Sequence, residues 1–356
     1  MSWIKRHKDS FRSWLIGICM VGIVVFGWYT FRMYQQKKTI EQMVASNQLT
    51  ENNQEESLET TTSQSDLPDF SQNVITWQGK TYRKNTYIKT ILCMGVDRSD
   101  DMIGTRDAGF AGQSDGIFLL AEDTARNQIK ILMIPRDTMT EIMITDDNNE
   151  EIGEEVNHLT LAYAYGDGGE KSCNYMKTAV TKLLCGLSID RYMAVDTKVI
   201  STLNDAVGGV TVTIPTDGME KSNPAFVKGS KVTLHGSDAE KFIRYRDITR
   251  DGSALFRMDQ HQEYIEQFFQ TVKHKSKEDS QIVPRMFDMI QDYMITDMQK
   301  AEYLKIALDI LSNGNLDNDA FETIPGIGVA TDTYDEYYAD KQQMIPILIE
   351  MFYREA

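Results

Sequence analysis

Three aspartates lie at the ends of apolar segments in this chain: Asp97, Asp115 and Asp137. One or two carboxylates suffice to hold Mg²⁺, because this ion keeps water and phosphate oxygens in the rest of its shell. A carboxylate in such a position can also take a proton from a hydroxyl group. If the apolar segments are neighbouring strands, the three side chains reach one edge of a sheet. Spacing alone favours the alternative, which is three solvated loop aspartates.

Four arginines can supply positive charge near these carboxylates: Arg136, Arg244, Arg246 and Arg257. The guanidinium group offers a planar set of donors that matches phosphate. Arg244 and Arg246 cannot face the same way on one helix, so at most one of them is expected to point at a ligand. The alternative is salt bridging on a helix surface, for which several aspartates lie nearby.

The stretch 128–138 positions the first of these residues. It begins with an apolar, β-branched run that predicts a buried strand, and Pro135 ends that strand because proline cannot donate a ladder hydrogen bond. Arg136 and Asp137 then emerge together at the carboxyl end of the strand, where open α/β sheets bind ligands. A short link to the preceding strand predicts an antiparallel pair, which places Asp115 at the same end. A strand-ending turn with a surface ion pair is the alternative.

Strands and helices alternate along the chain, and this predicts an α/β domain with a central mixed β-sheet flanked by helices. The predicted strands are 87–94, 116–121, 129–134, 190–195 and 210–214. The predicted helices are 171–185, 197–206, 237–246, 255–274 and 342–353, with a loop at 324–328. The helix 237–246 opens with Ser237 and Glu240 at the spacing of a capping box. Gln260, His261 and Tyr264 are predicted to form a polar stripe with Arg257.

The amino-terminal residues indicate a membrane anchor. Residues 1–12 are basic and predict a cytoplasmic tail, and residues 13–31 carry no charge and are long enough to form a transmembrane helix. A cleaved signal peptide is disfavoured because no small-x-small cleavage site follows the apolar run. Residues 32–73 are polar and predict a disordered extracellular stalk. Residues 74–356 then form the extracellular α/β domain, so the protein is expected in the cell membrane as a single-pass protein.

The charge argues against nucleic-acid binding, and the cysteines indicate neither a metal site nor a disulfide framework. The chain carries a formal charge of −16, and residues 1–40 alone carry +6, so the rest of the chain carries −22. A domain this acidic is not expected to bind nucleic acid. The four cysteines show no metal-binding spacing. Cys173 and Cys185 are predicted on one helix, too far apart for a disulfide.

Several motifs, taken in order, resemble the LytR-CpsA-Psr (LCP) family. They are Ile91-Leu-Cys-Met-Gly-Val-Asp97, Gly112-Gln-Ser-Asp-Gly-Ile-Phe-Leu-Leu120, Ile134-Pro-Arg-Asp-Thr138, Leu161-Ala-Tyr-Ala-Tyr-Gly166, Ile189-Asp-Arg-Tyr192, Leu203-Asn-Asp-Ala-Val-Gly-Gly-Val-Thr-Val212 and Phe242-Ile-Arg-Tyr-Arg246. The resemblance covers about residues 87–272. It implies a phosphotransferase that moves an anionic glycopolymer from an undecaprenyl-pyrophosphate carrier to peptidoglycan. The lipid tail is expected in an apolar groove of the domain.

The resemblance also implies roles for individual residues. Asp97 and Asp115 match the aspartates that bind Mg²⁺. Arg136 and Asp137 match the central Arg-Asp pair, which makes them the expected catalytic residues. The expected pyrophosphate-binding residues are Arg136, Arg244, Arg246 and Arg257.

The chain departs from the family pattern at two arginine positions, which are Gln113 and Gln260 here. These departures favour the second hypothesis, a non-catalytic polyprenyl-phosphate-binding or regulatory membrane protein.

Overall fold

The computed structural model describes residues 67–98, 111–247, 253–313, 316, 318–331 and 334–356. The predicted tail, the predicted transmembrane helix and the predicted stalk up to residue 66 lie outside these residues. Among the helices that the structure describes, none is long and apolar enough to cross a bilayer. Phe70 is fully buried, and its ring packs edge-on against Tyr353 with 5.3 Å between ring centroids. The packed domain therefore begins before the predicted boundary at Val74.

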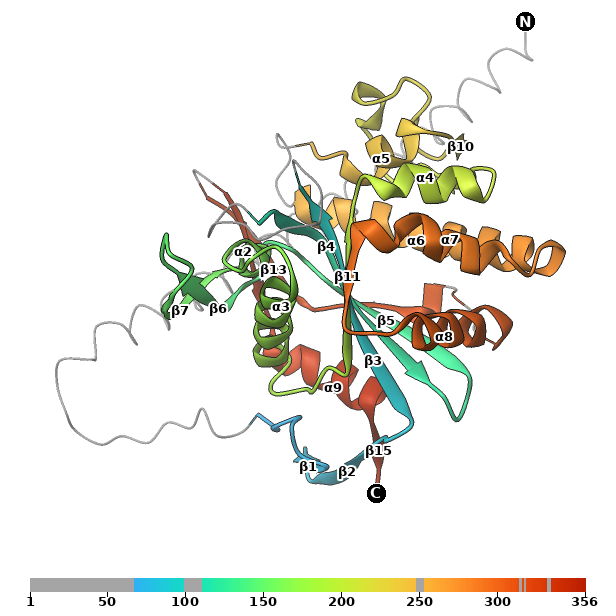
Figure 1. The fold of residues 1–356 in the computed structure, drawn as a ribbon. Coiled ribbons are helices and arrows are strands. Elements are labelled where there is room, and N and C mark those ends of the chain that lie inside the picture. Colours follow the sequence, from blue (N-terminus) through green and yellow to red (C-terminus); the bar gives the residue numbers. More distant parts are fainter. Residues whose placement is uncertain (1–66, 99–110, 248–252, 314–315, 317, 332–333) are drawn as a thin grey trace, which may run out of the picture. The chain divides into compact units, whose positions relative to one another are not determined.

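A six-stranded mixed sheet forms the centre of the domain (Figure 1). In spatial order its strands are β11 (Met294–Thr296), β8 (Arg191–Asp196), β3 (Ile88–Asp97), β4 (Gln113–Asp123), β5 (Gln128–Ile134) and β12 (Phe321–Thr323). Strand β3 is parallel to β8 and antiparallel to β4, and β4 is antiparallel to β5. Strand β11 is antiparallel to β8, and β12 is parallel to β5. The predicted α/β class with a central mixed sheet is confirmed.

Helices cover both faces of this sheet (Figure 1). Alternate residues of a strand face opposite sides, and Leu92 and Met94 of β3 pack into the core shared with α3 (Glu170–Leu183) and α9 (Lys341–Phe352). Ile91 and Cys93 face the other side. The helices on that side are α6 (Ser253–Glu278), α7 (Ile282–Ile290) and α8 (Lys300–Asn313). Because both faces are covered, Ile91 to Met94 read as an unbroken apolar run.

The remaining elements surround this layered core. They are β1 (Val74–Trp77), β2 (Lys80–Lys84), β6 (Met139–Thr145), β7 (Glu151–His158), α2 (Leu161–Ala164), α4 (Val199–Ala206), β9 (Val210–Thr213), η2 (Met219–Lys221), β10 (Lys231–Leu234), α5 (Ser237–Arg244), η3 (Gln291–Tyr293), η4 (Asn318–Ala320), β13 (Gly326–Ala330), β14 (Asp335–Ala339) and β15 (Tyr353–Glu355). All five predicted strands and all five predicted helices have a counterpart, with boundaries shifted by a few residues.

Three local predictions are wrong. The predicted loop 324–328 contains the start of β13, which pairs antiparallel with β14. The capping box does not form: Ser237 is already the first helical residue, and Gly236 is the N-cap with φ of 51° and no side-chain hydrogen bond. Helix α5 ends at Arg244 rather than at residue 246. Arg246 therefore lies beyond the helix. The expectation that at most one of Arg244 and Arg246 points at a ligand assumed that both lie on one helix, so it no longer applies.

A β-bulge separates the first two predicted metal ligands. In the β3–β4 pair, Gly95 is opposite Gly116 and Val96 is opposite Ser114, so Asp115 has no partner on β3. A bulge bends the strand and redirects a side chain. Asp97 and Asp115 consequently lie near the same end of two paired strands without being direct partners.

Cysteine chemistry plays no part in the structure that is described. Cys93 and Cys173 are buried, Cys185 is partly buried, and all three are free thiols. Burial raises the pKa of the Cys93 thiol to about 12, so it stays protonated and unreactive. Cys173 lies on α3, whereas Cys185 lies beyond the end of this helix at Leu183, so the two are not on one helix as predicted.

Candidate active site at the edge of the sheet

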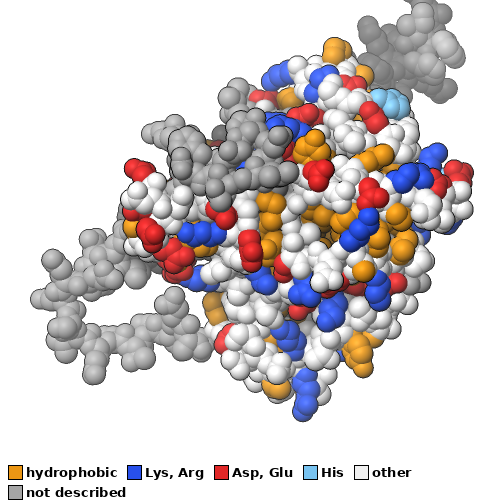
Figure 2. Space-filling view, viewed as in Figure 1, with side chains coloured by type: hydrophobic (Ala, Val, Ile, Leu, Met, Phe, Trp, Pro, Cys, Tyr) orange, Lys and Arg blue, Asp and Glu red, His pale blue; other side chains and the backbone are white. Residues whose placement is uncertain are grey.

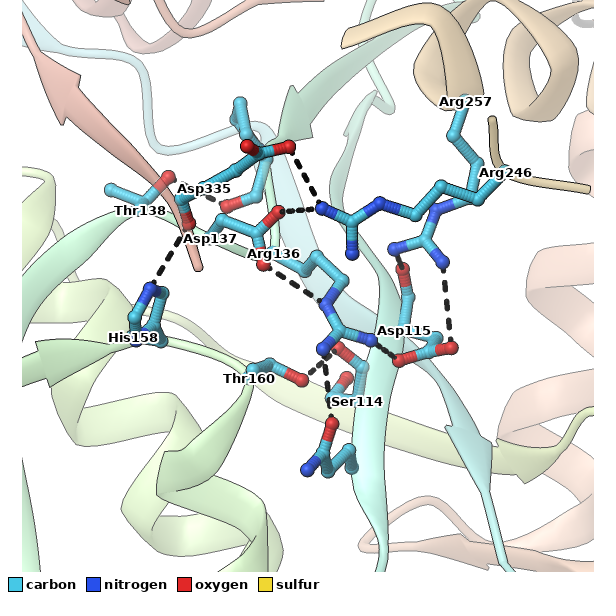
Figure 3. A network of polar contacts seen from close by, with 12 residues as sticks. Ser114, Asp115, Arg136, Asp137, Thr138, His158, Thr160, Arg246, Arg257 and Asp335 are labelled. Carbon is cyan, nitrogen blue, oxygen red and sulfur yellow. Dashed lines mark hydrogen bonds and ion pairs between the residues drawn. The ribbon is translucent and has the colours of Figure 1, made fainter. Parts of the chain in front are cut away.

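Arg136 is the centre of a polar network at the end of β5 (Figure 3). Its Nε donates to Oδ1 of Asp137 at 3.2 Å, its Nη1 donates to Oδ1 of Asp115, and its Nη2 donates to Oε1 of Gln113 at 3.0 Å. Three nitrogens of one guanidinium thus hold three acceptors from two elements. The side chain is 16% exposed, which leaves a face for a ligand.

The backbone around Arg136 is fixed by Thr160. Its N–H donates to the carbonyl oxygen of Arg136 at 3.0 Å, and its hydroxyl donates to the carbonyl oxygen of Ser114 at 2.9 Å. One residue therefore ties the end of β5 to the bulged end of β4. The predicted meeting of Asp115 and Asp137 at one edge of the sheet is confirmed, and the alternative of separate loop aspartates is excluded.

Arg257 reaches the same carboxylate from α6. Its Nη1 lies 3.5 Å from Oδ2 of Asp115, and its Nη2 donates to the main-chain oxygen of Asp115 at 3.5 Å. Burial lowers the pKa of Arg257 to about 10, while Asp115 acts in the opposite direction. The guanidinium remains charged at neutral pH. A cation this buried requires a carboxylate or another anion beside it.

Arg246 reaches Asp137 and Asp335 (Figure 3). Its Nη2 is 3.5 Å from Oδ2 of Asp137 and 2.9 Å from Oδ2 of Asp335. Asp335 begins β14, which touches the site through an isolated bridge between Thr138 and Tyr337. Asp335 is a site residue that the sequence patterns did not reveal.

Arg244 and Asp97 form a neighbouring pair. Nη2 of Arg244 donates to Oδ2 of Asp97 at 2.6 Å, and Nη1 donates to Oε1 of Glu240 at 2.8 Å. Burial alone would lower the pKa of Arg244, but Glu240 and Asp97 together outweigh burial and raise this pKa. The charge of Asp115 also raises the pKa of Arg244, so the central network acts electrostatically on Arg244.

The two departures from the family pattern have different surroundings. Gln113 belongs to the network, because it accepts a hydrogen bond from Arg136. Gln260 is 1% exposed, and its amide lies against the main-chain oxygens of Phe242 and Tyr245 at the end of α5. Three residues of the predicted polar stripe on α6 are buried, namely Arg257, Gln260 and Tyr264.

An apolar groove lies on two of the elements that carry the network. It has a volume of about 260 Å³ and lies between the sheet and helices α6, α7 and α8. Phe118 lines it from β4, the strand that carries Asp115, and Ile265 lines it from α6, the helix that carries Arg257. Figure 2 shows hydrophobic side chains gathered where Figure 1 places these helices. The groove and the arginines therefore share two elements.

The carboxylates present fit a hard divalent cation. Asp97 and Asp115 lie on paired strands, and two carboxylates with water and phosphate oxygens make a common Mg²⁺ shell. No third His, Cys, Asp or Glu completes a metal cluster among the residues that the structure describes. The donor set matches a cation that a phosphate ligand helps to hold, and it does not match a zinc site.

The fold and this edge define an α/β protein in which an arginine–carboxylate network and an apolar groove share a strand and a helix. Residues 33–351 match the model described as the LytR_cpsA_psr family, so the chain belongs to that family. The predicted family resemblance is confirmed.

One relative is the polyisoprenyl-teichoic acid–peptidoglycan teichoic acid transferase TagU of Bacillus cereus (strain AH820), with 27% identity over 240 residues. The match covers 67% of this chain and 64% of the relative, so the chain spans less than two thirds of that protein's length. The protein gbs0355 from Streptococcus agalactiae has the same fold, with a TM-score of 0.57, 21% identity and coverage of 75% of this chain and 87% of that chain. TagT bound to LIIa-WTA has a TM-score of 0.55, 17% identity and coverage of 75% and 90%.

Proposed function

We propose that this protein is a phosphotransferase that moves an anionic glycopolymer from an undecaprenyl-pyrophosphate carrier to peptidoglycan. The observation that carries the proposal is that the arginine network and an apolar groove are built on the same strand, β4, and the same helix, α6. A prenyl-linked pyrophosphate has the same two parts, an anionic head and a long apolar tail. Family membership and the name of the TagU relative support the choice of substrate and acceptor.

The arginines bind the pyrophosphate in this proposal. Arg136, Arg244, Arg246 and Arg257 come from three elements of the chain and converge on a few carboxylates. The phosphate oxygens would take donors that the carboxylates now occupy. Charge that develops on the leaving polyprenyl phosphate is then stabilised by guanidinium groups already in place.

Asp137 is the proposed general base. Its carboxylate is held by Arg136 on one oxygen and Arg246 on the other, so it lies next to any phosphate that these arginines bind. The hydroxyl of the acceptor sugar, the 6-hydroxyl of muramic acid, attacks the phosphorus that carries the glycopolymer. Its proton passes to Asp137 as the bond to the polyprenyl phosphate breaks.

Asp97 and Asp115 are the residues that would hold Mg²⁺. The ion would supply positive charge to the bound pyrophosphate and help neutralise its oxygens. Both carboxylates already lie among the arginines that this proposal assigns to phosphate, because Arg244 pairs with Asp97 and Arg136 pairs with Asp115.

The site is proposed to act outside the cell membrane. The sequence expectation of a cytoplasmic tail, a transmembrane helix at 13–31 and an extracellular domain places the groove on the side of the bilayer where peptidoglycan is built. A membrane anchor also keeps the domain near a lipid-linked substrate.

Filling the groove tests the proposal. Ala307 lines the groove, and Ala307→Trp should weaken capture of geranylgeranyl pyrophosphate by about tenfold or more because it removes space for the tail. Capture of inorganic pyrophosphate should not change. Ala225→Trp is the control because Ala225 is exposed. Equal loss for both ligands would contradict the assignment of the groove to the lipid.

Transfer itself decides between an enzyme and a binding protein. The full chain in detergent is supplied with a short-chain lipid-linked saccharide, Mg²⁺ and peptidoglycan fragments. Radiolabel in the peptidoglycan supports the transferase. Capture of the lipid without any transfer would instead establish the non-catalytic hypothesis.

A further inference from the structure

Helix α5 carries Arg244 on its last turn and delivers Arg246 just beyond its end. The final carbonyl groups of a helix have no partner within the helix and need one from elsewhere. In α5 these carbonyls point toward α6. The hydrogen bonds that these carbonyl groups accept therefore decide how firmly Arg244 and Arg246 are held.

Gln260 and His261, adjacent residues of α6, supply those partners. With its amide nitrogen turned toward α5, Gln260 donates to the carbonyl oxygens of Tyr245 at 3.1 Å and Phe242 at 3.2 Å. Nε2 of His261 lies 3.2 Å from the carbonyl oxygen of Ile243. Two side chains thus satisfy three carbonyl groups around Arg244.

Both side chains are suited to this task. Gln260 is 1% exposed, so its amide has no access to solvent and must bond to protein. Burial and the nearby charge of Arg257 lower the pKa of His261 to about 4, so the ring is neutral at pH 7 and can carry its proton on Nε2. The ring also lies over Gly116, next to Asp115 in the bulge.

We propose that Gln260 and His261 are positioning residues, which fix the carboxyl end of α5 and thereby hold Arg244 and Arg246 toward the pyrophosphate site. The effect on ligands rests on the proposed function, whereas the effect on α5 does not. Gln260 is thus a structural donor that acts through the arginines, rather than the loss of a phosphate-binding group. The departure from the family pattern at this position does not remove the site.

The test removes the donors of Gln260 and keeps its shape. Gln260→Met keeps the length of the side chain and removes both donors. If Gln260 only fills space, methionine is tolerated. If Gln260 caps α5, methionine loosens the end of that helix.

Gln270→Met is the matched control. Gln270 lies on the same helix and also donates its amide to a main-chain oxygen, that of Leu316 at 3.1 Å. It has no contact with α5 among the described hydrogen bonds. Its substitution removes an equivalent hydrogen bond without touching the arginines.

Two measurements on the full chain in detergent separate the claims. Hydrogen exchange of the segment 242–247 should speed up at least tenfold in Gln260→Met and stay unchanged in Gln270→Met. Capture of geranylgeranyl pyrophosphate should weaken about tenfold in Gln260→Met alone, the loss expected when one charged hydrogen bond is misplaced. Unchanged exchange in Gln260→Met would overturn the inference. If the wild-type chain binds no prenyl pyrophosphate, the proposed function fails, while the exchange result still decides the capping role.

Discussion

Substitution of Arg136 by lysine should separate turnover from binding. Arg136 donates from three nitrogens to Asp137, Asp115 and Gln113, which lie on two sides of the guanidinium. An ammonium group has one nitrogen and cannot span these acceptors. Arg136→Lys therefore keeps the charge and loses the fixed orientation of the donors.

The expected magnitude follows from the contacts that lysine loses. Lysine can keep about one of the three, so about two charge-assisted hydrogen bonds are lost, each worth about 1.5 kcal/mol for a partly exposed group. If both hydrogen bonds stabilise the transition state, their loss raises the activation free energy by about 3 kcal/mol, which makes transfer roughly 100-fold slower. Capture of the ground-state lipid should weaken by a smaller factor, because charge on the leaving phosphate develops only during reaction.

Single-turnover transfer and equilibrium capture of geranylgeranyl pyrophosphate are measured on the same preparation. Arg191→Lys is the control, because Arg191 starts β8 at the opposite end of the sheet and donates from Nε to Glu302 at 2.9 Å. Equal losses of transfer and capture in Arg136→Lys would show that the guanidinium acts only in binding. Transfer within a factor of two of wild type would refute the argument from rigid placement.

Three further outcomes are expected. Chelation of Mg²⁺ should weaken pyrophosphate capture at least tenfold, and Asp97→Asn should make capture insensitive to Mg²⁺. If the wild-type protein captures pyrophosphate equally well with and without the chelator, the metal has no place in the proposal. The free energy of unfolding should fall as pH drops from about 6.5 to about 4, because the unfolded His261 binds a proton in this range and the folded one does not. His261→Gln should flatten this dependence of the free energy of unfolding on pH. If the substitution leaves the dependence unchanged, the folded ring titrates normally. Protease added outside intact cells should cut within residues 48–67 and release the domain, whereas protection of this segment would reverse the expected orientation.

The sequence predicted those parts of the fold that carry strong periodicity. The strands from β3 to β5 are buried on both faces, so their apolar runs are long and clear. Strand β7 is different: most of its residues are exposed, and it is held by main-chain pairing with β6. Its sequence shows no alternation of apolar and polar residues, and the hairpin could not be predicted from it.

The candidate site was predictable only where it lies close in sequence to a strand end. Arg136 and Asp137 follow a buried strand, and Asp115 lies on its antiparallel neighbour, so hydrophobic pattern and pairing bring them together. Asp335 is 89 positions from its partner Arg246 and arrives on β14 through long-range contacts. The capping role of Gln260 was likewise hidden, because only the packing of α6 against α5 turns its amide toward the carbonyl groups.

The charge balance of the network gives a physical reason to expect a cation with the substrate. Among the residues that the structure describes, the ion pairs at this edge join four arginines to five carboxylates, and the latter are Asp97, Asp115, Asp137, Glu240 and Asp335. These nine described side chains carry a formal charge of −1, in a domain that is itself acidic. A pyrophosphate adds further negative charge at close range, which costs free energy unless positive charge enters with it. In the proposed function, Asp97 and Asp115 would hold Mg²⁺, and phosphate oxygens would replace their carboxylates on Arg244, Arg136 and Arg257. Such an exchange leaves every buried guanidinium with an anionic partner before and after binding, which is the condition that a cation as buried as Arg257 imposes.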